Sequence, residues 1–246
     1  MNLILLEPQD YTAPNRAYLR TAQENSSTND ERAQHIREVL QAKAGDNIKV
    51  GNVNGLLGTA EILTIDANGV ALHVTLTQSP PAKLPLTLIL ALPRPKVLRR
   101  ILRSVAELGV RELILLNTYK VEKSYWQSPA LAPERIREYF IEGLQQSRDS
   151  VLPIIRCEKR FKPFVEDQLP AIIDTTIAFV AHPGDDIAAC PLALNQACTL
   201  AVGPEGGFIP YEVEKLRQAG LEQIQLGERI LRVENAMTTL IARLFT

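Results

Sequence analysis

The residues that could carry chemistry in this sequence are concentrated in a glycine-rich stretch near the C-terminus. Leu200–Phe208 reads LAVGPEGGF, an apolar run into three glycines, and Pro210 then begins a stretch with helical periodicity. Glycines at the carboxyl end of a buried parallel strand let a ligand approach the backbone closely. The stretch lacks the Gly-Lys-Ser/Thr of a P-loop and the GxGxxG of a dinucleotide site. Alone, it is equally compatible with an ordinary strand-to-helix turn.

A second glycine turn follows the first, with Gly227 placed 20 residues after Gly207. Gln223–Leu226 has the character of a short strand, and Gly227–Ala236 reads GERILRVENA before a helical stretch rich in Thr, Leu and Ala. Charged residues interleave with apolar ones in this turn. Neither stretch is diagnostic by itself, but the two in this order and spacing are far more specific.

The elements around these turns are alternating strands and helices. Four apolar runs are typical of strands buried on both faces: Leu84–Leu92, Val110–Leu116, Thr176–Ala181 and Thr199–Val202. Four amphipathic stretches between and after them predict helices: Lys96–Leu108, Pro133–Ser147, Pro210–Ala219 and Val233–Leu244. Repeated βα units imply a mostly parallel sheet with helices on both faces.

The N-terminal part has a different pattern, predominantly of short strands. Asn54-Gly55 and Asn68-Gly69 are dipeptides that favour tight hairpins. One predicted helix interrupts the strands, with Asn29 or Asp30 as its cap and Gly45-Asp46 as its end. Its expected apolar stripe is Ala33, Ile36, Val39 and Leu40. The economical interpretation is a small β-barrel with one helix, joined to the rest by the proline-bearing stretch Thr77–Lys83.

Composition is typical of a folded chain and argues against a membrane-spanning one. The 246 residues include 46% hydrophobic and 22% charged side chains, ordinary values for a folded chain, and no window has the length and apolarity of a membrane span. The start carries no secretory signal, and the cysteines Cys157, Cys190 and Cys198 form no CxxC pair, so we expect a reducing cytoplasmic location without disulfides. No cluster has metal-ligand spacing, so no metal is expected.

The two glycine motifs together resemble those of a known family. GPEGGF at Gly203–Phe208 followed by LGERILRVENA at Leu226–Ala236 is similar to the paired C-terminal signature of SPOUT methyltransferases. More narrowly, it resembles RsmE-type enzymes, which methylate uracil N3 in 16S ribosomal RNA. Supporting similarity lies in QHIREVL at Gln34–Leu40, ELGV at Glu107–Val110 and EGLQQS at Glu142–Ser147.

The resemblance implies an α/β fold in two domains. Residues 84–246 would form a SPOUT-type parallel-sheet domain tied in a trefoil knot, and residues 1–78 a PUA-like β-barrel that contacts RNA. It also implies S-adenosylmethionine (AdoMet) as cofactor, a homodimer, and 16S rRNA or the small ribosomal subunit as partner, without a membrane. The implied AdoMet-binding residues lie in three loops: Val180, Ala181 and His182; Gly203, Pro204, Glu205, Gly206 and Gly207; Leu226, Gly227, Ile230 and Leu231.

Two charged residues of the second signature are candidates for catalysis. Methylation of uracil N3 requires loss of the imide proton, which a nearby cation or base assists. We expect Arg232 to stabilise the anionic uracil and Glu234 to orient it or to take the proton. A surface ion pair at a helix start is the alternative, and Glu205 could instead be the polar anchor.

The net charge of −1 is close to zero, but the sequence also contains a local cluster of positive charge. Residues 1–82 hold 6 basic and 9 acidic side chains, whereas residues 83–246 hold 21 and 19. Five cations fall between residues 94 and 103, and a loop of cations and aromatic residues follows, suited to phosphates and unstacked bases. The predicted RNA-binding residues are His35, Arg94, Arg99, Arg100, Arg103 and Lys123. The alternatives are a solvated helix face for Arg99, Arg100 and Arg103, and a cap on the barrel for His35. In the loop of Lys120, Lys123, Tyr125 and Trp126, the tryptophan could equally be a packing anchor. His73 is expected to be structural.

The chain departs from the family pattern mainly at positions expected to face RNA. Its first strand lacks the usual arginine, Arg94-Pro-Lys96 replaces Lys-Gly-Asp, and Gln146–Asp149 reads QSRD in place of Gln-Ser-Gly-Arg. These differences indicate a divergent branch. Three functions remain open from the sequence: uracil-N3 methylation, methylation of another RNA position such as a ribose hydroxyl, and a non-catalytic role in RNA binding or ribosome assembly.

Overall fold

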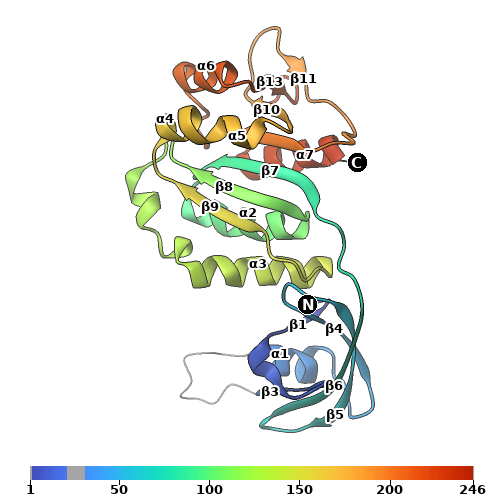
Figure 1. Ribbon diagram of the computed structural model, residues 1–246. Coiled ribbons are helices and arrows are strands. Elements are labelled where there is room, and N and C mark those ends of the chain that lie inside the picture. Colours follow the sequence, from blue (N-terminus) through green and yellow to red (C-terminus); the bar gives the residue numbers. More distant parts are fainter. Residues whose placement is uncertain (1, 21–30, 246) are drawn as a thin grey trace. The chain divides into compact units, whose positions relative to one another are not determined.

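The computed structural model describes residues 2–20 and 31–245 and divides into two compact units (Figure 1). The first unit is Met1–Pro81 with Ile141–Leu152, and the second is Ala82–Phe140 with Pro153–Thr246. Nothing in the sequence pattern sets Ile141–Leu152 apart from its neighbours. Its membership in the first unit rests on backbone bonds: Asn2 N–H donates to Gln145 O at 3.1 Å and Asn54 N–H to Ser150 O at 2.7 Å.

The first unit is a curled six-stranded sheet around one short helical segment. Its elements are β1 (Ile4–Leu6), η1 (Pro8–Asp10), β2 (Tyr11–Ala13), β3 (Arg16–Arg20), α1 (Glu31–Gln34), η2 (His35–Val39), β4 (Asn47–Asn52), β5 (Leu57–Ile65) and β6 (Gly69–Gln78). The strand order is β1-β4-β5-β6-β3-β2, antiparallel except for the parallel pair β1–β4. Hairpins at Asn54-Gly55 and Asn68-Gly69 join β4, β5 and β6 as predicted.

The predicted helix of this unit is wrong at its C-terminal end. Ala33 and Ile36 are fully buried in the core, but Val39 and Leu40 are exposed. The helix ends in the π-helical turn η2 rather than at Gly45, because Gln41 adopts a positive φ of 49° and turns the chain away. The proposed caps Asn29 and Asp30 lie outside the described residues. Two strands at the edge of the sheet, β2 and β3, were not among the predicted elements.

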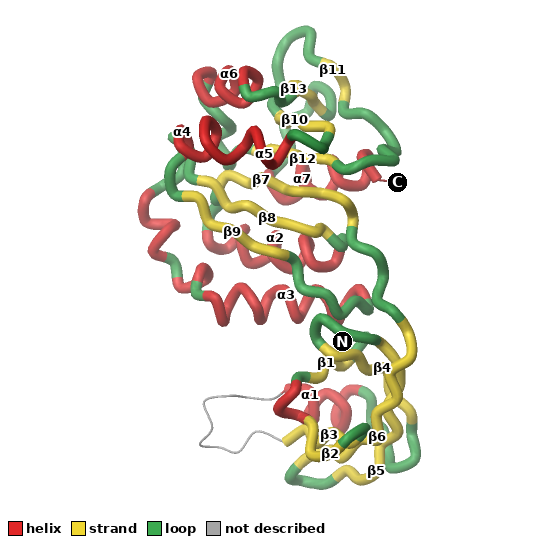
Figure 2. The backbone as a smooth tube through the Cα atoms, viewed as in Figure 1, coloured by secondary structure: helices red, strands yellow, loops and turns green. Residues whose placement is uncertain are grey.

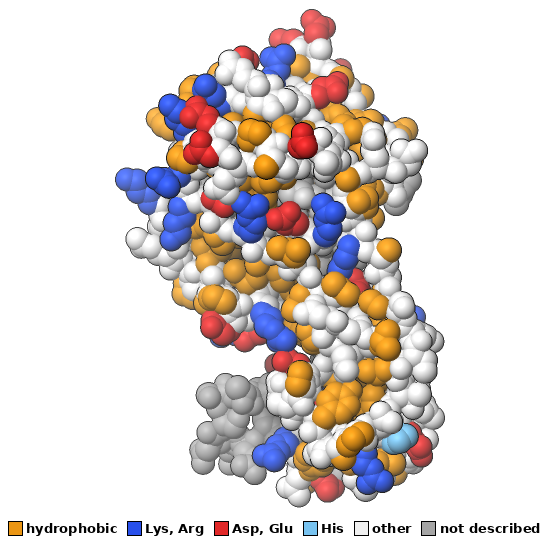
Figure 3. Space-filling view, in the orientation of Figure 1, with side chains coloured by type: hydrophobic (Ala, Val, Ile, Leu, Met, Phe, Trp, Pro, Cys, Tyr) orange, Lys and Arg blue, Asp and Glu red, His pale blue; other side chains and the backbone are white. Residues whose placement is uncertain are grey.

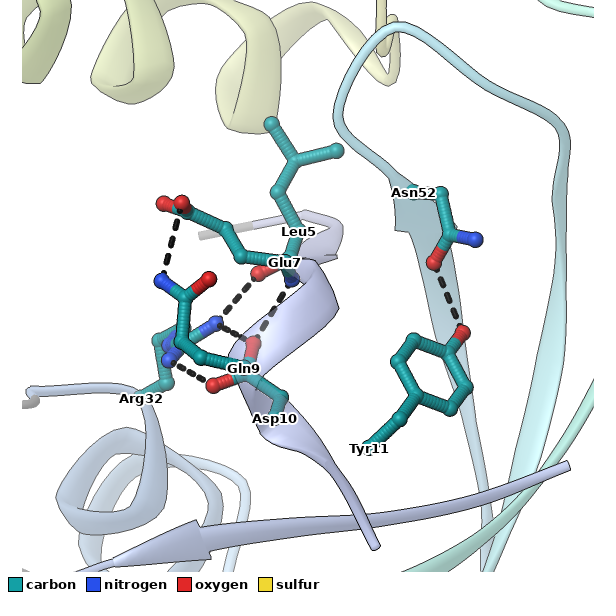
Figure 4. Close-up of polar contacts among 7 residues, drawn as sticks. All are labelled: Leu5, Glu7, Gln9, Asp10, Tyr11, Arg32 and Asn52. Carbon is teal, nitrogen blue, oxygen red and sulfur yellow. Dashed lines mark hydrogen bonds and ion pairs between the residues drawn. The ribbon is translucent and has the colours of Figure 1, made fainter. Parts of the chain in front are cut away.

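A partly buried ion pair fixes the helical segment against the start of the chain (Figure 4). Arg32 donates from Nη1 and Nη2 to the two oxygens of Asp10 at 2.7 and 2.9 Å, and from Nη1 to Leu5 O at 2.7 Å. The same carboxylate accepts the backbone N–H of Glu7 at 2.7 Å. A bidentate guanidinium–carboxylate pair is directional, so it holds α1 in one orientation on β1 and η1.

The second unit is a seven-stranded, all-parallel sheet in the order β11-β13-β10-β12-β7-β8-β9. Its strands are β7 (Leu84–Ala91), β8 (Val110–Leu116), β9 (Ile154–Glu158), β10 (Ile177–Ala181), β11 (Ala188–Ala189), β12 (Cys198–Val202) and β13 (Glu222–Gln225). Its helices are α2 (Pro95–Glu107), η3 (Lys123–Gln127), η4 (Pro129–Leu131), α4 (Phe161–Pro163), η5 (Phe164–Gln168), α5 (Leu169–Ile173), α6 (Pro210–Gln218) and α7 (Val233–Phe245). Helix α3 (Pro133–Ser147) begins in this unit, and its residues from Ile141 onward belong to the first. The parallel α/β architecture expected from the sequence is confirmed.

Helices pack on both faces of this sheet. In Figures 1 and 2, α2 lies behind the sheet and α4 and α5 lie in front of it. Helix α2 also contacts α7, and α6 contacts β10 and β13. The five residues of the central strand β12 are all buried, as an apolar run covered on both faces requires. Among the described residues, no helix is both long and apolar enough to cross a membrane.

Candidate functional site

The two glycine turns lie together around one cavity of about 330 Å³ in the second unit. The first turn follows β12 and the second follows β13, and both strands neighbour β10 in the parallel sheet. Their carboxyl ends therefore meet at one edge, where open α/β sheets bind ligands. The volume is within the range of small-molecule sites.

Eleven of the residues predicted to bind AdoMet line this cavity. They are Ala181, His182, Gly203, Pro204, Glu205, Gly206, Gly207, Leu226, Gly227, Ile230 and Leu231. The twelfth, Val180, is fully buried one residue earlier in β10 and is not part of the lining. Ile230 is 88% exposed, so this apolar side chain at the cavity is available to a ligand.

Glycine is required by the backbone at two of these positions. Gly207 has φ +69° and donates its N–H to Pro204 O at 2.7 Å, which closes a tight turn. At Gly203 a Cβ would lie 3.0 Å from the Phe208 nitrogen and 3.2 Å from Gly207 Cα. A side chain at either position would strain or displace the loop that forms the cavity wall.

His182 is the ionisable side chain of the cavity with a clear electrostatic shift. Burial lowers its pKa below the ordinary 6.5, and the positive charge of Lys120 lowers this pKa further. Its position is fixed by its backbone, because its N–H donates to Ile224 O at 3.0 Å and its carbonyl accepts Gln223 Nε2 at 2.9 Å. The imidazole is therefore neutral at pH 7, with one ring nitrogen available as an acceptor.

The candidate catalytic residues flank the cavity rather than line it. Arg232 is exposed and Glu234 is half-buried, on either side of Val233, which does line the cavity. Glu234 does not pair with Arg232; its Oε1 accepts Arg100 Nη2 of α2 at 2.9 Å. Their catalytic roles stay predictions.

The predicted RNA-binding residues fall into both units. Arg94, Arg99, Arg100 and Lys123 are exposed in the second unit, and Arg103 lies over the Tyr139 ring at 4.9 Å from its centroid. His35 lies in the first unit at the start of η2, half-buried. RNA contact by any of them stays a prediction.

Two residues in the loop of cations and aromatic residues after β8, Trp126 and Lys120, make different kinds of contact. Trp126 is half-buried and donates from Nε1 to Asn117 Oδ1 at 2.8 Å, with the Lys159 ammonium 5.9 Å from its ring centroid, contacts that fit a packing anchor. Lys120 instead extends over the first glycine turn and donates from Nζ to Gly206 O at 2.5 Å.

One wall of the cavity comes from residues outside the predicted site. Val233, Ala236 and Leu240 of α7 line it, and their i, i+3, i+7 spacing places them on one helix face. This helical periodicity was the signal that could have identified them. Pro183 and Arg229 also line the cavity. Across the part of the chain that the structure describes, no group of His, Cys, Asp and Glu side chains is arranged to hold a metal ion.

Comparison with known proteins decides the family. Residues 80–245 match the model of the RNA methyltransferase domain. The chain is also 32% identical over 241 residues to ribosomal RNA small subunit methyltransferase E of Treponema pallidum, covering 96% of this chain and 87% of that protein. The chain belongs to the ribosomal RNA small subunit methyltransferase E family. The resemblance drawn from the two glycine motifs is thereby confirmed.

Solved structures share the fold of this methyltransferase E chain. A probable rRNA methyltransferase from Porphyromonas gingivalis superposes with a TM-score of 0.71 at 23% identity, covering 98% of this chain and 95% of that one. A ribosomal RNA small subunit methyltransferase E from Neisseria gonorrhoeae, bound to S-adenosyl methionine, gives 0.70 at 20% identity with the same coverage. At these identities the likeness establishes the fold of the chain.

Proposed function

We propose that this protein uses AdoMet to methylate N3 of a uracil in 16S rRNA of the small ribosomal subunit. The observation that carries the proposal is the convergence of both glycine turns on one cavity in a chain of the methyltransferase E family. The relatives' name specifies small-subunit ribosomal RNA, and a structural neighbour has S-adenosyl methionine bound. The uracil N3 position comes from the RsmE-type resemblance of the two motifs.

The cavity residues fit the chemistry of AdoMet. Leu226, Ile230 and Leu231 offer apolar surface for the adenosine, and the backbone of the two glycine turns offers hydrogen bonds for its polar edge. Gly203 and Gly207 allow the tight turn that shapes this wall. When bound, AdoMet supplies an electrophilic methyl group whose leaving thioether is neutral.

The protein's own residues would act on the acceptor. Uracil N3 carries a proton that must be lost, and the resulting anion is stabilised by a nearby fixed cation. Arg232, beside the cavity wall at Val233, would supply that cation. Glu234, held by Arg100, would orient the base or take the proton.

The remaining family properties are part of the same proposal. The curled sheet of the first unit would be a PUA-like barrel that binds RNA, and the protein would act as a cytoplasmic homodimer. The second unit would carry a trefoil knot. In support of the knot, the loop between β10 and β12 bonds to the end of α7, with Ala193 N–H donating to Arg243 O at 2.9 Å and Leu194 N–H to Leu244 O at 2.6 Å.

A cavity-filling variant tests the cofactor site. Ala236→Leu places a larger side chain on the α7 face that lines the cavity, whereas Ala242→Leu makes the same change on an exposed position of that helix. Calorimetry should show AdoMet binding to the wild type and to Ala242→Leu. Binding should weaken about 10-fold or more in Ala236→Leu, equivalent to roughly 1.4 kcal/mol. A wild-type protein that binds no AdoMet would contradict the proposal and favour a scaffold role.

A further inference from the structure

We propose that Tyr119 and Lys120 form a platform for an unpaired RNA nucleotide beside the cavity, the ring stacking on its base and the ammonium binding its phosphate. The inference rests on the proposed function, because it assigns the positioning of that function's RNA substrate. Neither residue lines the cavity, and neither belongs to the glycine motifs. Both lie in the loop that leaves β8 and passes the outer side of the first glycine turn.

The backbone that carries Tyr119 is held by a buried carboxylate. Glu212 is 2% exposed, and its Oε1 accepts the Tyr119 N–H at 2.7 Å while its Oε2 accepts the Ile209 N–H at 3.0 Å. A buried carboxylate that accepts two backbone N–H bonds ties both segments together firmly. The loop after β8 is thereby fixed to the segment between the glycine turn and α6.

The pair of hydrogen bonds that Glu212 accepts, here called the Glu212 clamp, holds the Tyr119 backbone but does not involve the Tyr119 ring. Tyr119 is 79% exposed, although its main chain is held by a buried group. Tyr211, next to the clamping Glu212, is also exposed, at 50%. Rigid backbone with a protruding aromatic ring is the arrangement that single-stranded nucleic acid uses for stacking, and it costs little ordering of the protein on binding.

Lys120 adds an exposed positive charge that is held on the first glycine turn. Its Nζ donates to Gly206 O at 2.5 Å, and its stem lies so close that a Cβ on Gly206 would be 2.8 Å from Lys120 Cδ. An ammonium has three donors, so two remain for a ligand anion. Gly206 lines the cavity, so Lys120 lies directly against the cavity wall. Its charge also lowers the pKa of His182 on the inner side of that wall.

A cation and an exposed aromatic ring side by side favour RNA as the occupant. Base stacking supplies sequence-tolerant affinity, and a lysine supplies a phosphate contact. The Arg94 backbone N–H donates to Glu205 Oε1 at 3.0 Å, which places Arg94 next to the same glycine turn. The nucleotide bound here would be a neighbour of the methylated one.

The test compares four variants at these positions with one control. Tyr119→Ala removes the ring and Tyr119→Phe keeps it; Lys120→Met removes the charge and Lys120→Arg keeps it. Lys162→Met removes an equal charge from an exposed site on α4. Methyl transfer to small-subunit RNA gives KM and kcat, calorimetry gives the AdoMet affinity, and fluorescence anisotropy gives the affinity for a single-stranded uridine-containing oligonucleotide.

We expect Tyr119→Ala to raise the KM for RNA and the oligonucleotide Kd about 10-fold, as loss of one stacked base predicts. Its AdoMet affinity should stay near that of the wild type, and Tyr119→Phe should recover the RNA affinity. Lys120→Met should weaken RNA binding and reduce its log–log salt slope by about 0.7, whereas Lys120→Arg and Lys162→Met should not.

Unchanged oligonucleotide affinity in Tyr119→Ala would overturn the platform. So would a Tyr119→Phe variant as weak as Tyr119→Ala, or a Lys120→Met variant that lowers kcat alone. Failure of the proposed function is a separate result: a wild type that transfers no methyl group to RNA. The anisotropy comparison tests the platform even then.

Discussion

At the scale of single residues, His182 is the group whose environment the structure defines best. Burial and the charge of Lys120 both favour its neutral form, burial being the larger cause. The cavity therefore presents an uncharged imidazole beside the glycine turns at physiological pH. A neutral ring adds no further positive charge beside a cationic sulfonium, which agrees with the proposed cofactor.

This environment predicts a pH dependence with a definite sign. Below pH 6.5 the unfolded chain protonates His182 while the folded protein does not, so the free energy of unfolding should fall as pH drops from 6.5 to the folded pKa. An NMR titration of the His182 ring should show a midpoint below 6.5 in the wild type. The midpoint should rise in Lys120→Met, without reaching 6.5, and stay unchanged in Lys162→Met. An identical midpoint in Lys120→Met would contradict the assigned cause.

Arg232 is the residue on which the proposed chemistry depends most. Arg232→Ala should lower methyl transfer about 100-fold or more, the effect of removing one group that stabilises a developing anion. AdoMet binding should be largely retained, because Arg232 is not part of the cavity lining. Single-turnover transfer and calorimetry measure the two effects, with Arg217→Ala, an exposed arginine of α6, as control. Unchanged turnover would remove Arg232 from the mechanism.

At the scale of elements, the buried Glu212 joins α6 to the loop after β8. Glu212→Gln replaces one acceptor oxygen by an NH₂ group that faces a backbone N–H, so a buried donor is left without an acceptor. We expect a loss of about 1–3 kcal/mol in the free energy of unfolding, measured with urea. Glu214→Gln, on the exposed side of the same helix, should stay within about 0.5 kcal/mol of wild type. Equal stabilities of the two variants would show that the clamp contributes little.

Elements with strong patterns were predictable from the sequence. β7, β8, β10 and β12 were predicted to within about a residue, because long apolar runs identify buried parallel strands. β9, which reads IIRCE, lacks such a run because it is the edge strand. The end of the first-unit helix also could not be read from sequence, since a non-glycine residue, Gln41, makes the turn.

The site was predictable where it follows from local motifs. The two glycine turns contain nine of the eleven predicted cavity residues. The contact between Lys120 and Gly206, however, joins residues 86 positions apart. A pairing of this kind depends on the order of strands in the sheet, which no local pattern specifies. The ion pair of Arg100 with Glu234 has the same origin, through the packing of α2 on α7.

At the scale of the whole molecule, net charge is a poor guide to the partner. The formal charge of −1 conceals an acidic N-terminal segment and a slightly basic remainder. Figure 3 shows Lys and Arg side chains in a row across one face of the second unit, with acidic side chains among them. A polyanion would meet such local groups, so near-neutrality is compatible with an RNA substrate.

The central claim is that this protein places a methyl group on uracil N3 of small-subunit ribosomal RNA. Its most direct test is mass-spectrometric mapping of modified nucleosides in 16S rRNA from a strain that lacks the gene and from the same strain complemented with it. We predict that one 3-methyluridine disappears in the deletion strain and returns on complementation. An unchanged 3-methyluridine content, or the loss of a ribose-methylated nucleoside instead, would contradict the claim.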